Sequence, residues 1–272
     1  MMTSSSFKVW GGRLATFTSG EVNRRLHDID HLLEHLGGSR VVSSQNPAVF
    51  TRHYRAFLFD MDGTLLNSIA AAERVWSRWA ERHGLDVEAF LTTIHGARAI
   101  DTITRQALPG VDAQAEAAWI TDAEVNDVEG IVAIGGAVDF LKRLPAGQWA
   151  LVTSAPKALA LRRMEAAGIP VPAIMVTAED VASGKPDPAC YVLGAQRLGV
   201  PVQDCLVFED ATVGIRAAEA AGADVMVVTS THLAAIETEH ACIDGYEGLQ
   251  VLREADGRLA VREGEDRQRV AF

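Results

Sequence analysis

The chain has 272 residues, of which 48% are hydrophobic and 22% are charged. This composition is typical of a globular protein with one or two domains, and it excludes a disordered or fibrous chain. The 36 acidic and 25 basic side chains give a formal net charge of −11, which disfavours binding to nucleic acid or to an anionic membrane surface.

The cysteine content and the hydropathy pattern bear on the cellular compartment in which the protein is expected. The three cysteines show no Cys-x-x-Cys spacing, which argues against a disulfide framework or a cysteine-based zinc site. No apolar run approaches the roughly 20 residues of a membrane span, and residues 1–20 lack the apolar block of a secretory signal. We therefore expect a cytoplasmic protein that has neither a membrane nor a nucleic acid as its partner.

Residues 1–52 are predicted to form an N-terminal extension with one amphipathic helix. Thr18-Ser19-Gly20-Glu21 has the spacing of a capping box. Apolar side chains then recur at helical intervals from Val22 to Leu36, and two glycines follow. Two interpretations of this extension stay open: a helix for oligomerisation or partner binding, or the product of a start codon assigned too early.

From Tyr54 onward, short apolar runs alternate with helical stretches. Five runs end at small polar or acidic residues and are predicted to be strands: 57–59, 149–152, 174–176, 206–208 and 225–228. Helices are predicted between them at 157–167, 188–198 and 213–221. This alternation predicts an α/β fold with a parallel, doubly wound sheet, in which the chemistry collects beyond the carboxyl ends of the strands.

An inserted domain is predicted between the first two strands. About 90 residues separate these strands, far more than a crossover needs. Helical patterns at 68–83 and 113–128 predict an α-helical domain over residues 69–133. The core then comprises residues 53–68 and 134–240. Residues 241–272 are expected to form a C-terminal hairpin, turning at Asp256-Gly257, and a charged tail.

The strongest chemical signal is Asp60-Met61-Asp62-Gly63-Thr64, directly after the first strand. Two carboxylates at i and i+2 on a bending strand end can reach one ligand, and Gly63 permits the sharp bend. The alternative is a solvated turn, because Asp-Gly is common in turns. Glu209-Asp210 ends another strand, so four carboxylates are expected to meet at one sheet edge, where a cation must offset their repulsion. Oxygen ligands of this kind suit Mg²⁺ rather than zinc.

Two further segments carry groups that bind anions. Lys185 lies in Gly184-Lys185-Pro186 of a chain with only four lysines, and it can provide a fixed positive charge for a phosphate and for Asp60. Thr153-Ser154 offers a hydroxyl and backbone N–H groups near a helix start. The alternatives are a surface-loop lysine and an ordinary helix cap.

Along the chain these segments follow the order Asp60-x-Asp62-Gly63-Thr64, Thr153, Lys185 and Glu209-Asp210, each after a predicted strand. In this order they resemble the motifs of the haloacid-dehalogenase-like (HAD) superfamily over about residues 54–230. The inserted domain resembles the helical cap of that superfamily, and the resemblance implies a Rossmann-like core with strand order 3-2-1-4-5. Trp76-x-x-Trp79 and the segment Ile94-His95-Gly96-Ala97-Arg98 resemble those of sugar- and polyol-phosphate phosphatases of bacteria and yeast.

The resemblance implies roles for the matching residues. Asp60 would be the nucleophile that forms an aspartyl-phosphate, and Asp62 would protonate the leaving alcohol and then activate water. Thr153 and the Ser154 N–H would hold phosphate oxygens, while Lys185 would pair with Asp60 and the phosphate. The implied Mg²⁺ ligands are Asp60, the backbone carbonyl of Asp62, Asp210 and, mainly through water, Glu209.

The cap also supplies candidate residues. His95, Gly96 and Arg98 are candidates for substrate contacts, because an arginine can bind hydroxyl groups or a phosphate. The alternative is that His95 caps a helix and Arg98 lies at the surface. Trp76 and Trp79 are expected to pack in the core of the cap rather than to stack on a sugar.

Together these features predict a Mg²⁺-dependent phosphatase of small phosphorylated sugars or polyols. Asp62 argues against a dehalogenase, because cleavage of a carbon–halogen bond needs no acid and the dehalogenases of the superfamily lack this residue. One alternative is a sugar phosphomutase of the β-phosphoglucomutase type, which shares all four motifs. Another is a catalytically idle scaffold that binds a partner through the N-terminal helix. The sequence specifies neither the sugar nor an oligomeric state.

Overall fold

The computed structural model describes residues 48–232, 234 and 236–264. The helix predicted between Val22 and Leu36 and the charged end of the tail lie outside these residues. Within the described part of the chain, no helix combines the length and the apolar character that crossing a bilayer requires.

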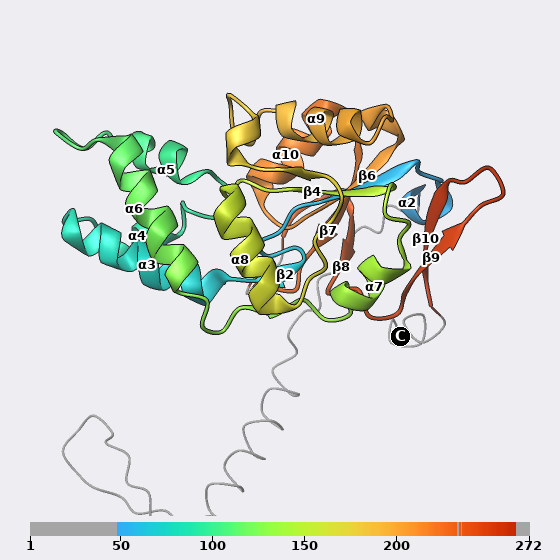
Figure 1. The fold of residues 1–272 in the computed structure, drawn as a ribbon, viewed down its shortest axis with the longest axis horizontal. Helices are drawn as coiled ribbons and strands as arrows, with labels where there is room; N and C mark the ends of the chain where they lie inside the picture. Colours follow the sequence, from blue (N-terminus) through green and yellow to red (C-terminus); the bar gives the residue numbers. More distant parts are fainter. Residues whose placement is uncertain (1–47, 233, 235, 265–272) are drawn as a thin grey trace, which may run out of the picture. The chain divides into compact units, whose positions relative to one another are not determined.

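Six parallel strands form the central sheet in the order β5-β4-β1-β6-β7-β8 (Figure 1). Counted along the chain, the first five follow the order 3-2-1-4-5 that the resemblance implied. All five predicted strands are present, at β1 (Ala56–Phe59), β4 (Trp149–Val152), β5 (Met175–Val176), β6 (Cys205–Glu209) and β7 (Asp224–Val228). The prediction of a doubly wound α/β core is therefore confirmed.

The sixth strand was not predicted. Residues 241–272 were assigned to a hairpin and a tail, whereas β8 (Ala241–Ile243) pairs in parallel with β7 and extends the core sheet. β8 has a single large apolar side chain, Ile243, and a partly exposed Cys242, so it lacks the strongly apolar run that marks the other strands. After it, β9 (Leu249–Arg253) and β10 (Leu259–Glu263) pair antiparallel around the Asp256-Gly257 turn.

Helices cover both faces of the sheet because successive side chains of each strand point to opposite faces. Phe57 and Phe59 of β1 pack in the apolar cluster that contains residues of α7 (Ala137–Arg143) and α8 (Lys157–Ala167). Leu58 packs in the opposite cluster with residues of α9 (Ala189–Arg197) and α10 (Thr212–Ala221). β1 is therefore buried on both faces, at the centre of the core.

The first described helix adds to this core. α2 (Ala48–Thr51) falls within the predicted extension of residues 1–52, yet it packs against β10 and β7. Arg52 Nη1 lies 2.8 Å from Asp224 Oδ1, and the Tyr54 hydroxyl donates to Asp224 Oδ2 at 2.7 Å. Residues 48–52 therefore pack against the core.

The inserted domain is helical, and it leaves and rejoins the core through a two-stranded stem. β2 (Leu66–Asn67) and β3 (Val132–Ala133) pair antiparallel, and α3 to α6 lie between them. Trp76 and Trp79 pack with Phe90 in the cap's own apolar cluster, as predicted. The four helices are α3 (Ile69–Arg82), α4 (Val87–Leu91), α5 (Ala99–Arg105) and α6 (Ala113–Asn126).

Hydrogen bonds fix the start of the loop that carries Lys185. In the short helical turn η1 (Ala178–Asp180), Thr177 N and Oγ1 donate to Asp180 Oδ2 at 2.8 and 3.0 Å. Arg197 Nη2 lies 2.6 Å from Asp180 Oδ1. The bond from Arg197, together with those from Thr177, lowers the pKa of Asp180 to about 2.

This ionised carboxylate predicts a pH-dependent contribution to stability. An aspartate in an unfolded chain has a pKa of about 3.9, so the contribution is fully present above that value and is lost as the pH falls towards 2. We expect Asp180→Asn to lower the free energy of unfolding by about 1 kcal/mol at neutral pH. Urea unfolding at a series of pH values should show this difference shrinking below about pH 4. A difference that is independent of pH would contradict the assignment.

Candidate active site

The predicted catalytic groups meet at the carboxyl ends of three adjacent strands. Asp60 follows β1, Thr153 follows β4 and Asp210 follows β6, and all three side chains are buried. The chain turns sharply after Asp60, where Gly63 adopts a φ of +87° and its N–H donates to Leu66 O at 2.7 Å. A Cβ atom on Gly63 would lie 2.0 Å from Asp210 Oδ2, so this turn requires glycine.

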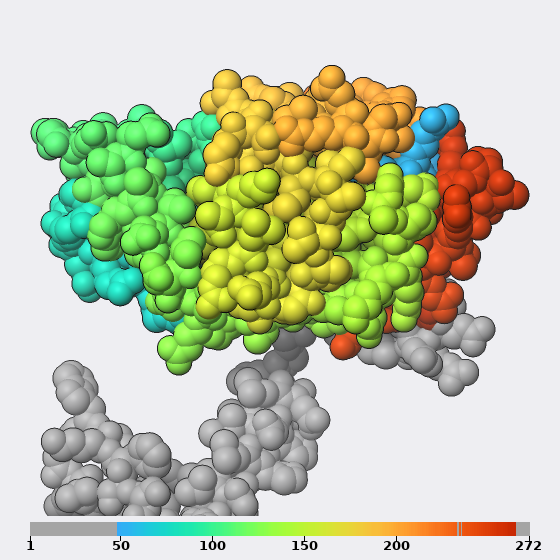
Figure 2. Space-filling model, viewed as in Figure 1, coloured from blue at the N-terminus to red at the C-terminus, as the bar shows by residue number. Residues whose placement is uncertain are grey.

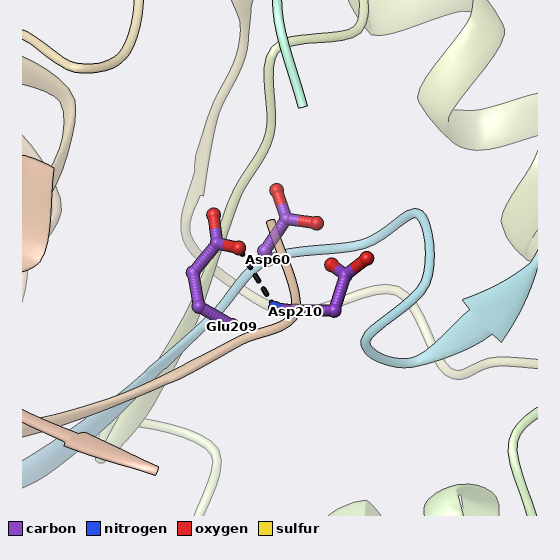
Figure 3. A group of neighbouring side chains, drawn as sticks. All are labelled: Asp60, Glu209 and Asp210. Atoms are coloured by element: carbon purple, nitrogen blue, oxygen red, sulfur yellow. Dashed lines mark hydrogen bonds between the residues drawn. The ribbon is translucent and has the colours of Figure 1, made fainter. Parts of the chain in front are cut away.

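Asp60, Glu209 and Asp210 form a buried group of carboxylates (Figure 3). One oxygen of each lies within 4.8 Å of those of the other two. Burial, followed by the negative charges of Glu209 and Asp60, raises the pKa of Asp210 well above its ordinary value. These all-oxygen donors fit a hard divalent cation, whose charge would offset their repulsion.

Lys185 provides a permanent positive charge within this group. Its Nζ lies 2.5 Å from Asp60 Oδ1 and 2.7 Å from Glu209 Oε1. Burial lowers the pKa of Lys185, but attraction to these carboxylates outweighs it and raises the pKa well above the ordinary value. Burial raises the pKa of Asp60 to about 7, and the nearby ammonium group opposes this shift.

The Glu209 carboxylate is fully occupied by hydrogen-bond donors from the protein. Its Oε1 accepts from Lys185 Nζ and from the Tyr191 hydroxyl, at 2.7 and 3.0 Å. Its Oε2 accepts from the backbone N–H groups of Asp210 and Ala211, at 2.8 and 2.9 Å. Glu209 thus holds Lys185 and the turn after β6 in place. The sequence had suggested Glu209 only as a metal ligand that acts mainly through water.

Asp62 lies apart from the three carboxylates, on the side of the cap. Ser68 Oγ donates to its Oδ1 at 2.6 Å, and Arg163 Nη1 lies 2.9 Å from its Oδ2. The two aspartates of the first motif therefore have different surroundings, because Asp60 contacts a buried ammonium and Asp62 contacts a hydroxyl and a guanidinium.

The segments after β4 and in the cap meet above this edge of the sheet. Ser154 Oγ donates to the backbone carbonyl of Gly96 at 2.8 Å. Gly96 has a φ of +74°, and a Cβ atom there would lie 2.6 Å from the Ala211 side chain. Thr153 Oγ1 accepts from Ala155 N at 3.0 Å, which orients its hydroxyl at the strand end.

His95 and Arg98 have different locations. His95 lines the cavity between cap and core, where burial lowers its pKa. Arg98 is absent from the cavity lining, because Asp101 binds its Nε and Nη2 at 2.6 and 2.9 Å. Its Nη1 donates to the carbonyls of Val181 and Ala182, both at 3.1 Å. Arg98 therefore joins the cap to the loop that carries Lys185, and the predicted substrate contact is not supported.

The cavity itself has a volume of about 390 Å³. Asp60, Asp62 and Asp210 line its floor, and Trp76 and His95 contribute from the cap. On one side the surfaces of cap and core meet where α6 packs against α8 (Figure 2). A phosphorylated molecule of a few carbon atoms fits a cavity of this size.

Two residues of the cavity wall, Arg163 on α8 and Glu124 on α6, were not predicted from the sequence. Arg163 is 5% exposed and Glu124 is 6% exposed. Arg163 follows Leu159 by one helical turn and therefore lies on the buried, apolar face of α8. A charged residue on that face is the sequence signal that could have identified Arg163.

The family model of haloacid dehalogenase-like hydrolases matches residues 54–222. The chain belongs to this family. It is 45% identical over 181 residues to hexitol phosphatase A of Escherichia coli (strain K12). This alignment covers 65% of this chain and 83% of that protein. It is 32% identical over 196 residues to 2-deoxyglucose-6-phosphate phosphatase 2 of Saccharomyces cerevisiae, covering 64% of this chain and 80% of that protein.

A solved structure shares the fold. The β-phosphoglucomutase of Clostridium difficile superposes with a TM-score of 0.63 at 20% identity, covering 72% of this chain and 93% of that chain. The resemblance to the HAD superfamily inferred from the sequence motifs is therefore confirmed.

The contact between Gly214 and Glu209 predicts the effect of a small substitution. A Cβ atom on Gly214 would lie 1.6 Å from Glu209 Oε1, so Gly214→Ala must displace the carboxylate that holds Lys185. We expect a loss of about 1–3 kcal/mol in stability, as for other overpacked cores. Loss of a hydrogen bond to a charged group should also lower phosphatase activity at least about tenfold.

Thermal unfolding and initial rates should be compared with those of Gly147→Ala. A Cβ atom on Gly147 would meet no atom within 4 Å, so this control should behave like the wild type. A Gly214→Ala variant as stable and active as the control would contradict the proposed role of Glu209.

Proposed function

We propose that this HAD-family chain is a Mg²⁺-dependent phosphatase that hydrolyses small sugar or polyol phosphates through an aspartyl-phosphate on Asp60. The observation that carries the proposal is the placement of two aspartates at one strand end in different surroundings. Asp60 contacts Lys185 inside the acidic group, whereas Asp62 faces the cap beside Arg163. A nucleophile and an acid–base residue require such a difference. The names of the two curated relatives, a hexitol phosphatase and a 2-deoxyglucose-6-phosphate phosphatase, support the substrate class.

The same residues account for binding of a phosphate dianion. The Lys185 ammonium, the Thr153 hydroxyl and the Ser154 N–H would hold phosphate oxygens at the floor of the cavity. Asp60, Asp210 and the backbone carbonyl of Asp62 would hold Mg²⁺, with Glu209 acting by positioning Lys185. Bound Mg²⁺ supplies positive charge that neutralises the carboxylates and the phosphoryl oxygens.

The first chemical step breaks the ester bond. A carboxylate oxygen of Asp60 attacks phosphorus, and the bond between phosphorus and the ester oxygen breaks. Asp62 donates a proton to that oxygen, so the product leaves as a neutral alcohol. Asp60 then carries the phosphoryl group as a mixed anhydride.

The second step regenerates the enzyme. Asp62, now a carboxylate, takes a proton from a water molecule as its oxygen attacks phosphorus. The bond between phosphorus and Asp60 breaks, and inorganic phosphate leaves. Contacts between cap and core at Gly96 and Arg98 limit the access of bulk water to the first step.

A panel of hexitol, hexose, pentose and glycerol phosphates tests the function directly. We expect phosphate release with Mg²⁺, none with EDTA, and none from Asp60→Asn, because an amide cannot act as the nucleophile. Asp60→Asn should remain folded in thermal unfolding, since an amide removes one of the repelling buried charges. Release by Asp60→Asn at the wild-type rate, or no release by the wild type from any compound, would refute the proposal.

Asp62→Asn separates the two steps. Loss of general acid catalysis should slow the first turnover of a polyol phosphate by about 10²–10⁴-fold. The first turnover of p-nitrophenyl phosphate should change far less, because nitrophenolate leaves without a proton. Rapid-quench measurements should then show a burst of nitrophenolate followed by slow hydrolysis of the aspartyl-phosphate. An equal loss for both substrates in the first turnover would argue against Asp62 as the acid.

A further inference from the structure

Arg163 and Glu124 form a charged pair between core and cap inside the cavity wall. Arg163 lies on α8 of the core and Glu124 on α6 of the cap, with Arg163 Nη2 3.1 Å from Glu124 Oε1. Both residues are more than nine-tenths buried, and both line the cavity. The pair is therefore within reach of a molecule bound in the cavity.

Stability alone does not explain this pair. Removing two charges from water costs about as much as their attraction returns, and apolar side chains of similar size often stabilise a protein equally well. Arg163 Nε is also buried with no hydrogen-bond partner. Such a donor is destabilising until an acceptor satisfies it, and the hydroxyl oxygen of a bound ligand would be one.

The location of the pair relative to Asp62 identifies the part of the substrate that it faces. Asp62 would donate a proton to the ester oxygen, and Arg163 contacts the other side of the same carboxylate, with Nη1 2.9 Å from Oδ2. Glu124 lies beyond Arg163, further into the cap. Moving away from the phosphate, the substrate's carbon atoms would therefore pass Arg163 and Glu124.

Carboxyl groups outnumber cations in this outer part of the cavity, where Asp62, Glu73 and Glu124 surround Arg163. Burial raises the pKa of Glu124 to about 7, and the charge of Arg163 opposes this shift. Among the described residues that line the cavity, Arg163 is the one with a permanent positive charge, and Asp62 and Glu124 already neutralise it. Glu73 adds a further carboxylate, and burial lowers the pKa of the nearby His95, which favours its neutral form. A second phosphate or a carboxylate on the substrate would meet no unpaired cation here.

We propose that Arg163 and Glu124 bind hydroxyl groups on the carbon skeleton and that the acidic outer cavity excludes substrates with a second anionic group. The inference rests on the proposed function and narrows its substrate class to monophosphates of neutral polyols and sugars. Bisphosphates and phosphorylated carboxylic acids are excluded. A phosphomutase that passes through a sugar bisphosphate would need the opposite charge in this region.

Glu124→Gln is the variant that tests the pair, because glutamine has the same shape and keeps an acceptor for Arg163. Asp122→Asn is the matched control, since it removes one negative charge from the exposed side of the same helix. Both variants and the wild type should be assayed on sorbitol 6-phosphate, on sorbitol 1,6-bisphosphate and on p-nitrophenyl phosphate. Thermal unfolding establishes that each variant is folded.

For the wild type we expect kcat/KM to be at least about 100-fold higher for the monophosphate than for the bisphosphate, a difference within the range for an unfavourable buried charge. Glu124→Gln should raise KM for sorbitol 6-phosphate about tenfold, as for one hydrogen bond to a charged group. It should also reduce the preference for the monophosphate over the bisphosphate about tenfold. Asp122→Asn should match the wild type throughout.

The outcomes separate this inference from the function on which it rests. If the wild type hydrolyses all three compounds and Glu124→Gln has unchanged KM and preference, the inference is wrong and the proposed function stands. Equal wild-type kcat/KM for the monophosphate and the bisphosphate would also overturn it. If the wild type releases phosphate from none of the three, the proposed function fails as well.

Discussion

The buried ammonium group of Lys185 is the interaction on which the active site depends. Its contacts with Asp60 and Glu209 join the ends of β1 and β6 to the loop after β5. Without that charge, two carboxylates would lie unpaired in a buried environment, at a cost of several kcal/mol for each. Glu209 uses its remaining acceptor sites to hold the turn that carries Asp210. One cation therefore fixes the relative positions of groups that lie far apart in the sequence.

Charge divides the cavity into two regions with different chemistry. Lys185 is buried beneath the floor, and in the proposed function it accepts a dianion together with the backbone around the strand ends. In the outer region, Arg163 is neutralised by its own neighbours, Asp62 and Glu124. The fold is shared with a β-phosphoglucomutase, so the fold alone does not determine the reaction. The outer region, built from a core helix and a cap helix, is where proteins with this fold can differ.

The sequence predicted the residues at the strand ends but not those between core and cap. Asp60, Thr153 and Asp210 follow apolar runs, and in a parallel sheet the carboxyl ends of neighbouring strands meet at one edge, so their proximity follows from topology. The environments of Arg98 and Arg163 depend instead on how a separate group of helices packs onto the core. Arg98 was a candidate for substrate contact, yet it binds Asp101 and two carbonyls away from the cavity lining, and local spacing gave no signal of this. β8 was missed because Ala241–Ile243 offers a single large apolar side chain, whereas each predicted run carries several.

The short stem of the cap has a consequence for how the protein folds. β1 and β4 are neighbours in the sheet, although the whole cap lies between them in the sequence. Pairing of β2 with β3, two residues each, brings the two ends of the insertion together, and the cap has its own apolar cluster to support that pairing. Once the stem has formed, the loop that must close between β1 and β4 consists of residues 60–65 and 134–148, which include α7. The entropy of loop closure, which rises with loop length, is then smaller than for the whole intervening segment. The central strands can thus pair almost as if the cap were absent.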